Sequence, residues 1–488
     1  MGYEQFLREE VEEDAPLIEG TRYNVQVERL DKRGSGQAVV WRENKKGNMG
    51  KLRLTIPYTI PGEEVHVTVA EPLKRRWKTT VDEIVKPHPD RVEAACKHFE
   101  RCGGCSWQHY SYEGQLREKT NLVKGYVQGA GFDPDLVEST VGAESPWHYR
   151  NKMEYTFGAD GSLGMHEPGD FRTIVPLEEC LIMRPDMKAA VLEVGSWTKE
   201  HQLSGYNKDT HEGLLRHLMV RQSFVTDEIL LAVFATEAPD AVPEVKELMK
   251  RIEKNHPNVK SLMWLENRDI ADRAQAADED IHLLAGRDFI YDELMGYRFR
   301  VWYDTFFQPN PKQAQKLVEL AMEMGQPKAD ESMIDLFCGV GTFSLPFATR
   351  VKKLAGIEIV ETSIQSAKRN ASDNEIDNTY FLAKDARKGI DEVLEQFGTP
   401  ELLLLDPPRS GAGGKVMRRI GRAQPSRIVY VSCNPETFAE DIKQLEPYGY
   451  KLRKVQPVDM FPQTFHVECV SLLELTDDVD EEVRRELM

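Results

Sequence analysis

The sequence predicts a multidomain α/β protein, with a small OB-like β-barrel at the N-terminus, a central α/β domain, and a doubly wound, Rossmann-like α/β domain at the C-terminus. Short apolar strands separated by tight turns, such as Pro61-Gly62, occupy residues 19–84, which is typical of a small barrel. From residue 306 onward, apolar runs such as 333–337 and 402–405 alternate with helical segments. This alternation indicates a parallel sheet covered by helices.

The length of 488 residues suits several domains rather than one. The sequence has no run of about 18 apolar residues that would suit a membrane-spanning helix. Its first residues are acidic, where a signal peptide would be basic and then apolar, so we expect a cytoplasmic protein without a membrane partner. The expected segments are an acidic tail over 1–18, the barrel over 19–84, a central domain containing a group of cysteines over 85–305, the Rossmann-like domain over 306–476 and an acidic tail over 477–488.

The overall charge argues against a nucleic-acid partner. The formal net charge is −18, whereas proteins that bind nucleic acids usually carry a basic surface. Net charge alone therefore favours a solvated acidic protein that binds no RNA. Basic residues do gather locally, in Lys74-Arg75-Arg76-Trp77-Lys78 and between Arg409 and Arg422, so the motifs must decide the question.

A glycine-rich turn follows the first strand of the Rossmann-like domain, in Cys338-Gly339-Val340-Gly341-Thr342. Glycines there let the backbone turn sharply and let a ligand approach the main chain. Glu358 ends the next strand, where an acidic residue grips a ribose, and Asp385 follows the third strand, where it would meet an adenine. Leu345 replaces the last glycine of a dinucleotide fingerprint. The pattern favours S-adenosylmethionine over a dinucleotide, with an ordinary strand-to-helix turn as the alternative.

Two residues are candidates for covalent chemistry. Cys433 lies between a strand and a helix, where helix-terminal amides favour a thiolate; the alternative is a buried cysteine that acts as a small apolar residue. Glu468 begins the last strand in an apolar setting, where burial would raise its pKa toward neutrality, as a base requires; the alternative is a surface glutamate. Asp406, in Asp406-Pro407-Pro408-Arg409, is held at the sheet edge by a loop that the prolines stiffen, but similar loops occur in methyltransferases that act on nitrogen.

A thiolate and a base are the groups needed to methylate carbon 5 of uracil. Carbon 5 is a poor nucleophile until a thiolate adds to carbon 6 and turns the ring into an enolate. After methyl transfer, a base must remove the proton from carbon 5 so that the thiolate can leave.

Three segments together resemble the RNA uridine-5-methyltransferase family: Asp406-Pro407-Pro408-Arg409, Ser432-Cys433-Asn434-Pro435 and Phe465-His466-Val467-Glu468. The resemblance covers nearly the whole chain. It implies an S-adenosylmethionine-dependent enzyme that forms 5-methyluridine in RNA, with Cys433 as the nucleophile and Glu468 as the general base. Residues 306–310 resemble the family's FxQxN segment, in which Gln308 contacts the cofactor and Phe306 lies near the flipped base. By motif position, the other cofactor contacts implied are Phe337, Thr342, Glu358, Asp385 and Asp406; asparagine is common where Thr342 stands.

The cysteines suggest a metal site. Cys96, Cys102 and Cys105 lie close in sequence, and Cys180 lies further along. Four thiolates hold zinc or an iron–sulfur cluster, and three clustered cysteines with a distant fourth favour [4Fe–4S] over zinc or unrelated free thiols. The spacing is also similar to the cluster motif of the family's RumA-like ribosomal branch, whose first strands form an RNA-binding TRAM barrel. The resemblance thus implies a structural [4Fe–4S] cluster, with 23S ribosomal RNA as the substrate and transfer RNA as the alternative.

Two other classes of protein fit less well. Radical S-adenosylmethionine enzymes usually carry Cys-x3-Cys-x2-Cys, whereas five residues separate Cys96 from Cys102. A non-catalytic RNA-binding scaffold would not need Cys433 and Glu468. A uridine in folded RNA must be extruded to reach a thiolate. The candidates to contact RNA are Phe306, Tyr149, the Arg150-Asn151-Lys152 stretch and Trp77, and the alternative for each is a core or solvated residue. No obligate protein partner is expected.

Overall fold

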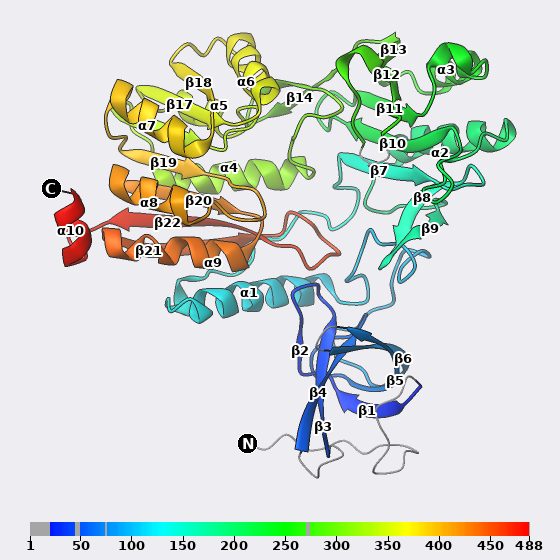
Figure 1. Ribbon diagram of the computed structural model, residues 1–488, viewed down its shortest axis with the longest axis horizontal. Helices are drawn as coiled ribbons and strands as arrows, with labels where there is room; N and C mark the ends of the chain where they lie inside the picture. Colours follow the sequence, from blue (N-terminus) through cyan, green and yellow to red (C-terminus); the bar gives the residue numbers. More distant parts are fainter. Residues whose placement is uncertain (1–19, 44–48, 74–75, 270–273, 488) are drawn as a thin grey trace. The chain divides into compact units, whose positions relative to one another are not determined.

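The computed structural model describes residues 20–43, 49–73, 76–269 and 274–487 (Figure 1). The expected acidic tail over 1–18 and the basic residues Lys74 and Arg75 lie outside this part of the chain. The chain forms two compact units: unit 1 contains the residues up to Gln115 together with Gln463–Phe465, and unit 2 contains Leu116–Pro462 and the residues from His466 onward. Within the described residues, no helix has the length and apolar character needed to cross a membrane.

Unit 1 is built on a six-stranded sheet with the strand order β1-β5-β6-β4-β3-β2. The strands predicted in this region are confirmed, whereas their closure into a TRAM-like barrel stays a prediction. Val65, Val67 and Val69 are fully buried and alternate with more exposed residues along β5, as expected for a strand with one face on a core. The strands are β1 Arg22–Gln26, β2 Arg29–Leu30, β3 Gly36–Glu43, β4 Met49–Ile56, β5 Glu64–Leu73 and β6 Arg76–Lys86.

The cysteine-bearing segment belongs to unit 1, whereas the sequence analysis assigned it to a central domain that begins at residue 85. Two contacts explain the difference. Arg91 forms an ion pair with the fully buried Glu63, with its Nε 2.5 Å from Oε1. Trp107 packs against Ile60, and its Nε1 donates a hydrogen bond to the Gly34 carbonyl at 3.0 Å. These long-range contacts, which local sequence patterns do not reveal, join residues 91–107 to the N-terminal sheet.

The first sheet of unit 2 has seven strands in the order β13-β12-β11-β10-β7-β8-β9. Every residue of β10 and β11 is buried. This burial explains why 229–235 is a continuous apolar run rather than an alternating one. The elements are β7 Lys152–Phe157, β8 Leu163–Glu167, β9 Asp170–Pro176, α2 Pro185–Glu200, β10 Leu215–Gln222, β11 Ile229–Ala235, α3 Val245–Asn255, β12 Val259–Glu266 and β13 Ile281–Gly286.

The second sheet of unit 2 is the predicted doubly wound sheet, with the order β18-β17-β16-β19-β20-β22-β21. The strands β16 to β20 are parallel, whereas β22 is antiparallel to both β20 and β21. The order departs from the Rossmann order 3-2-1-4-5-6 because β22 is inserted between the fifth and sixth strands. The strands are β16 Ser332–Leu336, β17 Lys353–Glu358, β18 Thr379–Ala383, β19 Leu402–Leu405, β20 Arg427–Ser432, β21 Tyr450–Val458 and β22 Glu468–Leu475.

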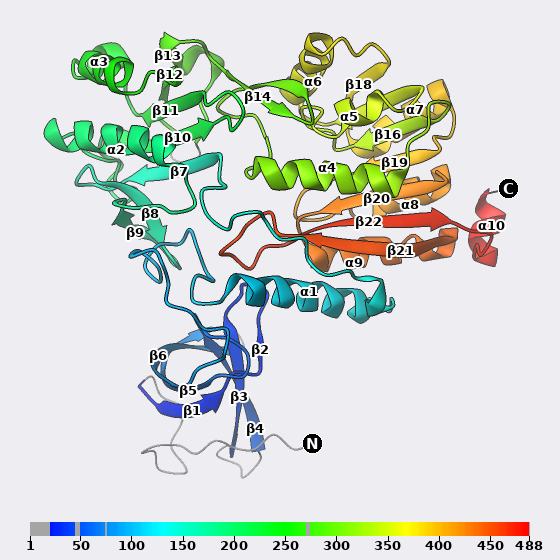
Figure 2. The same ribbon diagram turned by 180° about the vertical axis from the view of Figure 1, so that it is seen from behind.

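Helices cover this sheet, as Figure 2 shows from behind. They are α4 Pro311–Gly325, α5 Ser344–Ala348, α6 Glu361–Asp373, α7 Ala386–Phe397, α8 Gly414–Ala423 and α9 Pro435–Lys443, with α10 Glu481–Leu487 near the C-terminus. A hairpin of β14 Ile290–Leu294 and β15 Tyr297–Val301 precedes α4, and α1 Tyr112–Gly129 begins in unit 1 and continues into unit 2.

A buried ion pair ties α1 to the loop after β21. Lys119 Nζ lies 2.5 Å from Asp459 Oδ1, and both side chains are completely buried. Lys119 also donates to the Phe461 carbonyl at 3.2 Å. Because both charges are removed from water, they depend on groups of the protein for compensation.

Replacing Lys119 with Met is therefore expected to leave Asp459 buried and unpaired, which lowers the free energy of unfolding by about 3–5 kcal/mol. Urea unfolding followed by fluorescence measures the loss. The matched control is Lys451→Met, because Lys451 and Asp478 form a solvent-exposed ion pair, with side chains 44% and 75% exposed. Such surface pairs contribute about 0–1 kcal/mol to the free energy of unfolding. Equal losses in the two variants would contradict this account.

Candidate active site

The predicted site residues of the doubly wound domain follow its strands at one edge of the sheet. Phe337 follows β16, Asp406 follows β19 and Cys433 follows β20, while Glu358 is the last residue of β17. These strands are parallel neighbours, so their carboxyl ends meet at the same edge. Asp385 joins them there, two residues after the end of β18.

Strand pairing places Cys433 beside Glu468. Ser432 of β20 is paired with Cys469 of β22. Because the two strands are antiparallel, the residue after Ser432 and the residue before Cys469 are Cys433 and Glu468. The carboxyl group of Glu468 lies close enough to raise the pKa of the Cys433 thiol.

The Glu468 carboxyl has the properties of a base. It is 5% exposed, and burial raises its pKa to about 7, against the lowering effect of Arg409. His466, two residues earlier, has a pKa lowered to about 4 by burial and then by the cations Arg409, Lys119 and Arg150. A difference of about three pKa units makes Glu468 the stronger base by roughly a thousandfold.

Cys433 differs from the expectation that helix amides make it a thiolate. The pKa of its thiol is raised to about 11, first by burial and then by the carboxyl groups of Glu468 and Asp406, with Arg409 acting in the opposite direction. Asn434 caps α9, its side chain accepting from the Glu436 amide at 3.2 Å. Burial and two carboxyl groups outweigh the helix terminus, so the expectation is wrong for the protein alone, in which Cys433 is a neutral thiol.

Asp335 is a buried carboxyl group beside the predicted site that was not among the residues expected from the sequence. It is 1% exposed, and its Oδ1 is buried without a hydrogen-bond partner among the described residues, whereas its Oδ2 accepts from the Ser344 hydroxyl. Burial raises the pKa of Asp335 to about 7. The pKa of Asp406 is also raised well above its ordinary value, by burial and then by the nearby Glu468 and Asp335. The signal was an acidic residue inside an otherwise apolar strand.

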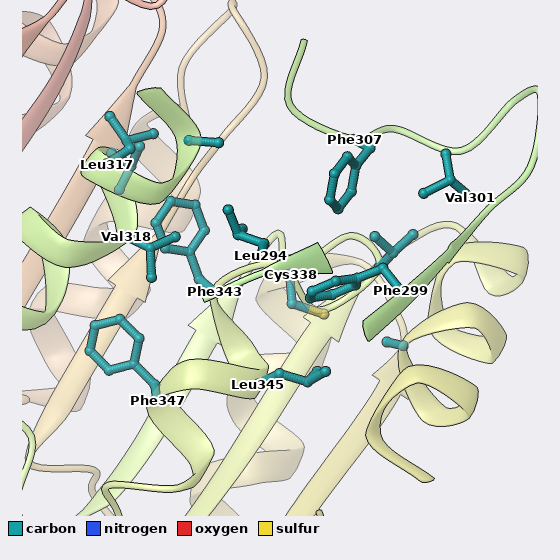
Figure 3. Close-up of a cluster of buried hydrophobic side chains, with 14 of the residues drawn as sticks. Leu294, Phe299, Val301, Phe307, Leu317, Val318, Cys338, Phe343, Leu345 and Phe347 are labelled. Carbon is teal, nitrogen blue, oxygen red and sulfur yellow. The ribbon is translucent and has the colours of Figure 1, made fainter. Parts of the chain in front are cut away.

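The glycine-rich turn after β16 has the backbone conformation that its sequence predicts. Gly341 has a φ of 90°, and a Cβ there would lie 2.8 Å from a Leu345 methyl carbon. Phe337 also has a positive φ, of 66°, and its amide donates to the Ile357 carbonyl at 2.8 Å. Figure 3 shows Cys338 and Leu345 in the apolar cluster beneath the turn. The turn is thus anchored on its inner side, and Thr342, within it, is 9% exposed.

The aromatic pair before Gln308 points in two directions. Phe307 is 4% exposed and packs on Phe299 (Figure 3). The centroids of these two rings are 5.4 Å apart, whereas Phe306 is 67% exposed. Gln308 itself is buried, and its carbonyl accepts from the Asn151 side chain at 3.1 Å. Phe306 is therefore free to contact a ligand, whereas the Asn151 contact fixes the position of Gln308.

The remaining candidates, Glu358, Asp385 and Tyr149, differ in their burial and hydrogen-bond partners. Glu358 accepts from the Ile359 and Val360 amides at 2.7 and 3.0 Å. Asp385 caps α7 and forms an ion pair with Arg387 at 2.9 Å, and hydrogen bonds from Arg387 lower its pKa. Tyr149 is 5% exposed and donates to the Pro462 carbonyl at 3.0 Å. Tyr149 is therefore a core residue, which was the alternative to stacking on RNA.

The described part of the structure does not show the metal site that the four cysteines predict. Among the described residues, no group of three or more His, Cys, Asp or Glu side chains is arranged to hold a metal ion. Cys96, Cys102 and Cys105 belong to unit 1 and Cys180 to unit 2, and all four are partly exposed. The [4Fe–4S] cluster therefore stays a prediction from the sequence, and no chemical step is assigned to one.

Comparison with known proteins identifies the family. Residues 245–476 match the profile of the tRNA (Uracil-5-)-methyltransferase family. An uncharacterised RNA methyltransferase of Caldanaerobacter subterraneus is 34% identical over 94% of this chain and 100% of its own length, and another from Halalkalibacterium halodurans is 34% identical over 95% and 99%. The crystal structure of the Pyrococcus abyssi tRNA (uracil-54, C5)-methyltransferase in complex with S-adenosyl-L-homocysteine has a TM-score of 0.73 and 28% identity, covering 92% of this chain and 99% of that chain.

The doubly wound domain therefore has a methyltransferase fold, and the protein is an RNA methyltransferase. The chain belongs to the RNA uracil-5-methyltransferase family.

The buried Glu468 predicts a pH-dependent gain in stability on its replacement. Its pKa is about 7 in the folded protein, against an ordinary value of 4.5, so the folded state loses stability relative to the unfolded chain as the pH rises from about 4.5 through 7. Glu468→Gln cannot ionise and is expected to gain up to about 3 kcal/mol over the wild type at pH 8, and little at pH 5. Thermal unfolding midpoints at both pH values measure the gain.

The matched control is Glu474→Gln on the same strand, because the Glu474 carboxyl is 41% exposed and pairs with Arg453. A Glu468→Gln variant whose gain is the same at pH 5 and pH 8 would show that the carboxyl is not held in a buried site.

Proposed function

We propose that this methyltransferase forms 5-methyluridine in RNA through a covalent bond between the Cys433 sulfur and carbon 6 of the target uridine, with Glu468 as the general base. The pairing of Ser432 with Cys469 carries this proposal, because it sets a thiol and a buried carboxyl side by side at the carboxyl edge of the sheet. No other cysteine of the doubly wound sheet has this position: Cys338 and Cys469 are buried.

The reaction requires two proton transfers at this pair. Cys433 must first lose its proton to water, and its sulfur then forms a bond to carbon 6 while the electrons of the carbon 5–carbon 6 double bond move toward the O4 oxygen. Carbon 5 would then accept the methyl group as the donor leaves as S-adenosylhomocysteine, and Glu468 removes the remaining proton from carbon 5. The electrons of that C–H bond form the carbon 5–carbon 6 double bond, and the carbon–sulfur bond breaks to release the thiolate.

S-adenosylmethionine would supply the methyl group and bring a positive charge to the site. The residues fit such a cofactor: Asp335 has an unpartnered buried oxygen, and burial keeps the pKa values of Asp335 and Asp406 raised. A cation next to these carboxyl groups would favour their ionised forms. The proposed contacts are Gln308, Phe337, Thr342, Glu358, Asp385 and Asp406, with Asp335 added.

The RNA target has two candidates. The cysteine motif and the N-terminal strands support 23S ribosomal RNA, through their similarity to the ribosomal branch of the family and its TRAM barrel. Transfer RNA is supported by the similarity to the Pyrococcus abyssi tRNA (uracil-54, C5)-methyltransferase over 92% of this chain. Methyl transfer from labelled S-adenosylmethionine to each RNA, transcribed without modifications, distinguishes the two.

Covalent trapping tests the nucleophile and the base. With RNA that contains 5-fluorouridine, the wild type is expected to form an adduct that survives denaturing electrophoresis, because fluorine at carbon 5 blocks the proton removal. Cys433→Ala is expected to lose the adduct and all methylation. Glu468→Gln is expected to form an adduct even with unmodified RNA and to release product at least about a hundredfold more slowly.

Cys469→Ala is the matched control, since its thiol is buried on the neighbouring strand, and it should retain the adduct. An adduct in Cys433→Ala, or normal product release by Glu468→Gln, would refute the assigned roles.

The iron–sulfur cluster stays a prediction from the sequence. It is tested by iron and sulfide analysis and visible absorbance after anaerobic purification. A [4Fe–4S] cluster requires about four iron atoms per chain, and the Cys96→Ser, Cys102→Ser and Cys105→Ser variants would each lose them. One zinc per chain, or no metal, would make the cluster prediction wrong.

A further inference from the structure

The hairpin of β14 and β15 in unit 2 has one buried face and one outward face. Its strands pair antiparallel, with Tyr291 opposite Arg300. Ile290 and Leu294 of β14 and Phe299 and Val301 of β15 are buried. The alternate residues point outward, as the two-residue period of a strand requires.

Arginine and aromatic side chains cover the outward face. The rings of Phe289 and Tyr291 have centroids 5.0 Å apart, and the rings of Phe289 and Trp302 are 5.5 Å apart. The Arg298 guanidinium lies 3.4 Å from the centre of the Tyr291 ring. We define the arginine–aromatic face by six residues: Phe289, Tyr291, Arg298, Arg300, Trp302 and Arg369.

Two of the three arginines on this face have charges that are not neutralised within the protein. Arg300 forms a bidentate ion pair with Asp373, at 2.7 and 3.0 Å. Arg298 and Arg369 are exposed and have no ion-pair partner in the part of the chain that is described, although Glu293 is opposite Arg298 in the strand register. Arg369 lies over the Trp302 ring, 5.8 Å from its centre. The chain has a net charge of −18, so two neighbouring arginines without ion-pair partners contrast with its overall acidic character.

The hairpin is fixed to the helix that follows the cofactor-binding strand β17. The Asn374 side chain of the loop after α6 both accepts from the Arg298 amide at 2.8 Å and donates to its carbonyl at 2.7 Å. Asn370 of α6 accepts from the Arg300 amide at 3.1 Å. These side chains satisfy backbone groups at the open edge of β15, where another strand would otherwise pair.

The chain leads from this face directly into the proposed site. Trp302 is four residues before the exposed Phe306 and six before Gln308, and α6 begins three residues after Glu358. Both β15 and α6 therefore connect the arginine–aromatic face to segments that carry proposed site residues, within a single unit (Figure 1).

We propose that the arginine–aromatic face binds the single-stranded RNA segment next to the target uridine. The proposal rests on the proposed function, because it assigns this surface to the same RNA substrate. Unpaired bases stack on aromatic rings and arginine planes, and free cations neutralise the phosphates between them. Arg298 and Arg369 contact phosphates, and Tyr291 and Trp302 receive bases. An RNA segment held here also keeps the extruded uridine close to Cys433.

The test measures binding of a fluorescein-labelled single-stranded (U)12 RNA to the full-length protein by fluorescence anisotropy at several salt concentrations. Each phosphate contact contributes about 0.7 to the slope of log affinity against log salt for single strands. The double variant R298A/R369A is expected to lower this slope by about 1.4. Trp302→Leu is expected to weaken binding by about 5- to 150-fold, the equivalent of one lost stacking contact, and to leave the slope unchanged.

Arg172→Ala is the matched control, because Arg172 has a side chain 64% exposed and is paired with Asp209; it should bind (U)12 like the wild type. Unchanged thermal midpoints verify that the exposed arginines do not support the fold. Wild-type affinity and slope in both R298A/R369A and Trp302→Leu would overturn the proposal. Cys433→Ala separates the two proposals, since it should lose the covalent adduct and keep the wild-type affinity for (U)12.

Discussion

The antiparallel insertion of β22 between β20 and β21 is the constraint on which the active site depends. In a fully parallel sheet, the first residue of β22 would lie at the amino edge, far from the cofactor turn. Because β22 runs in the opposite direction, Glu468 lies at the carboxyl edge, next to Cys433. The buried Lys119–Asp459 ion pair holds the loop that leads from β21 toward this strand. The reversal of a single strand thus brings Glu468 and Cys433 to the same edge of the sheet.

The charges around Cys433 and Glu468 are unfavourable in the protein alone and would be more favourable with a cationic cofactor bound. Three carboxyl groups, Asp335, Asp406 and Glu468, have pKa values raised first by burial. Glu468 and Asp335 further raise the pKa of Asp406, and Glu468 and Asp406 raise that of Cys433. Arg409 is the cation that acts on both Cys433 and Glu468. Such clustering costs stability, and sites where a fold accepts that cost are often functional. A cationic methyl donor would lower the pKa values of these groups, and it would also help Glu468 to be ionised when the uridine arrives.

Much of this site follows from local sequence. The ends of the parallel strands, the glycine turn and the prolines after Asp406 are short-range signals, and they predict which residues meet at one edge. The features of the site that the sequence did not predict depend on long-range contacts. The pairing of β22 with β20, the raised thiol pKa of Cys433 and the unpartnered oxygen of Asp335 follow from burial and from neighbours distant in sequence. The same is true of the cysteine segment, which the Arg91–Glu63 and Trp107–Gly34 contacts assign to unit 1.

The central claim is that Glu468 lies against the Cys433 thiol and disfavours its ionisation. Peptide-resolved mass spectrometry can measure the alkylation rate of Cys433 by iodoacetamide between pH 7.5 and pH 9.5, in the wild type and in Glu468→Gln. We expect faster alkylation of Cys433 in Glu468→Gln throughout this range, because removal of the carboxylate lowers the thiol pKa. Equal rates for Cys433 in the two proteins would contradict the account.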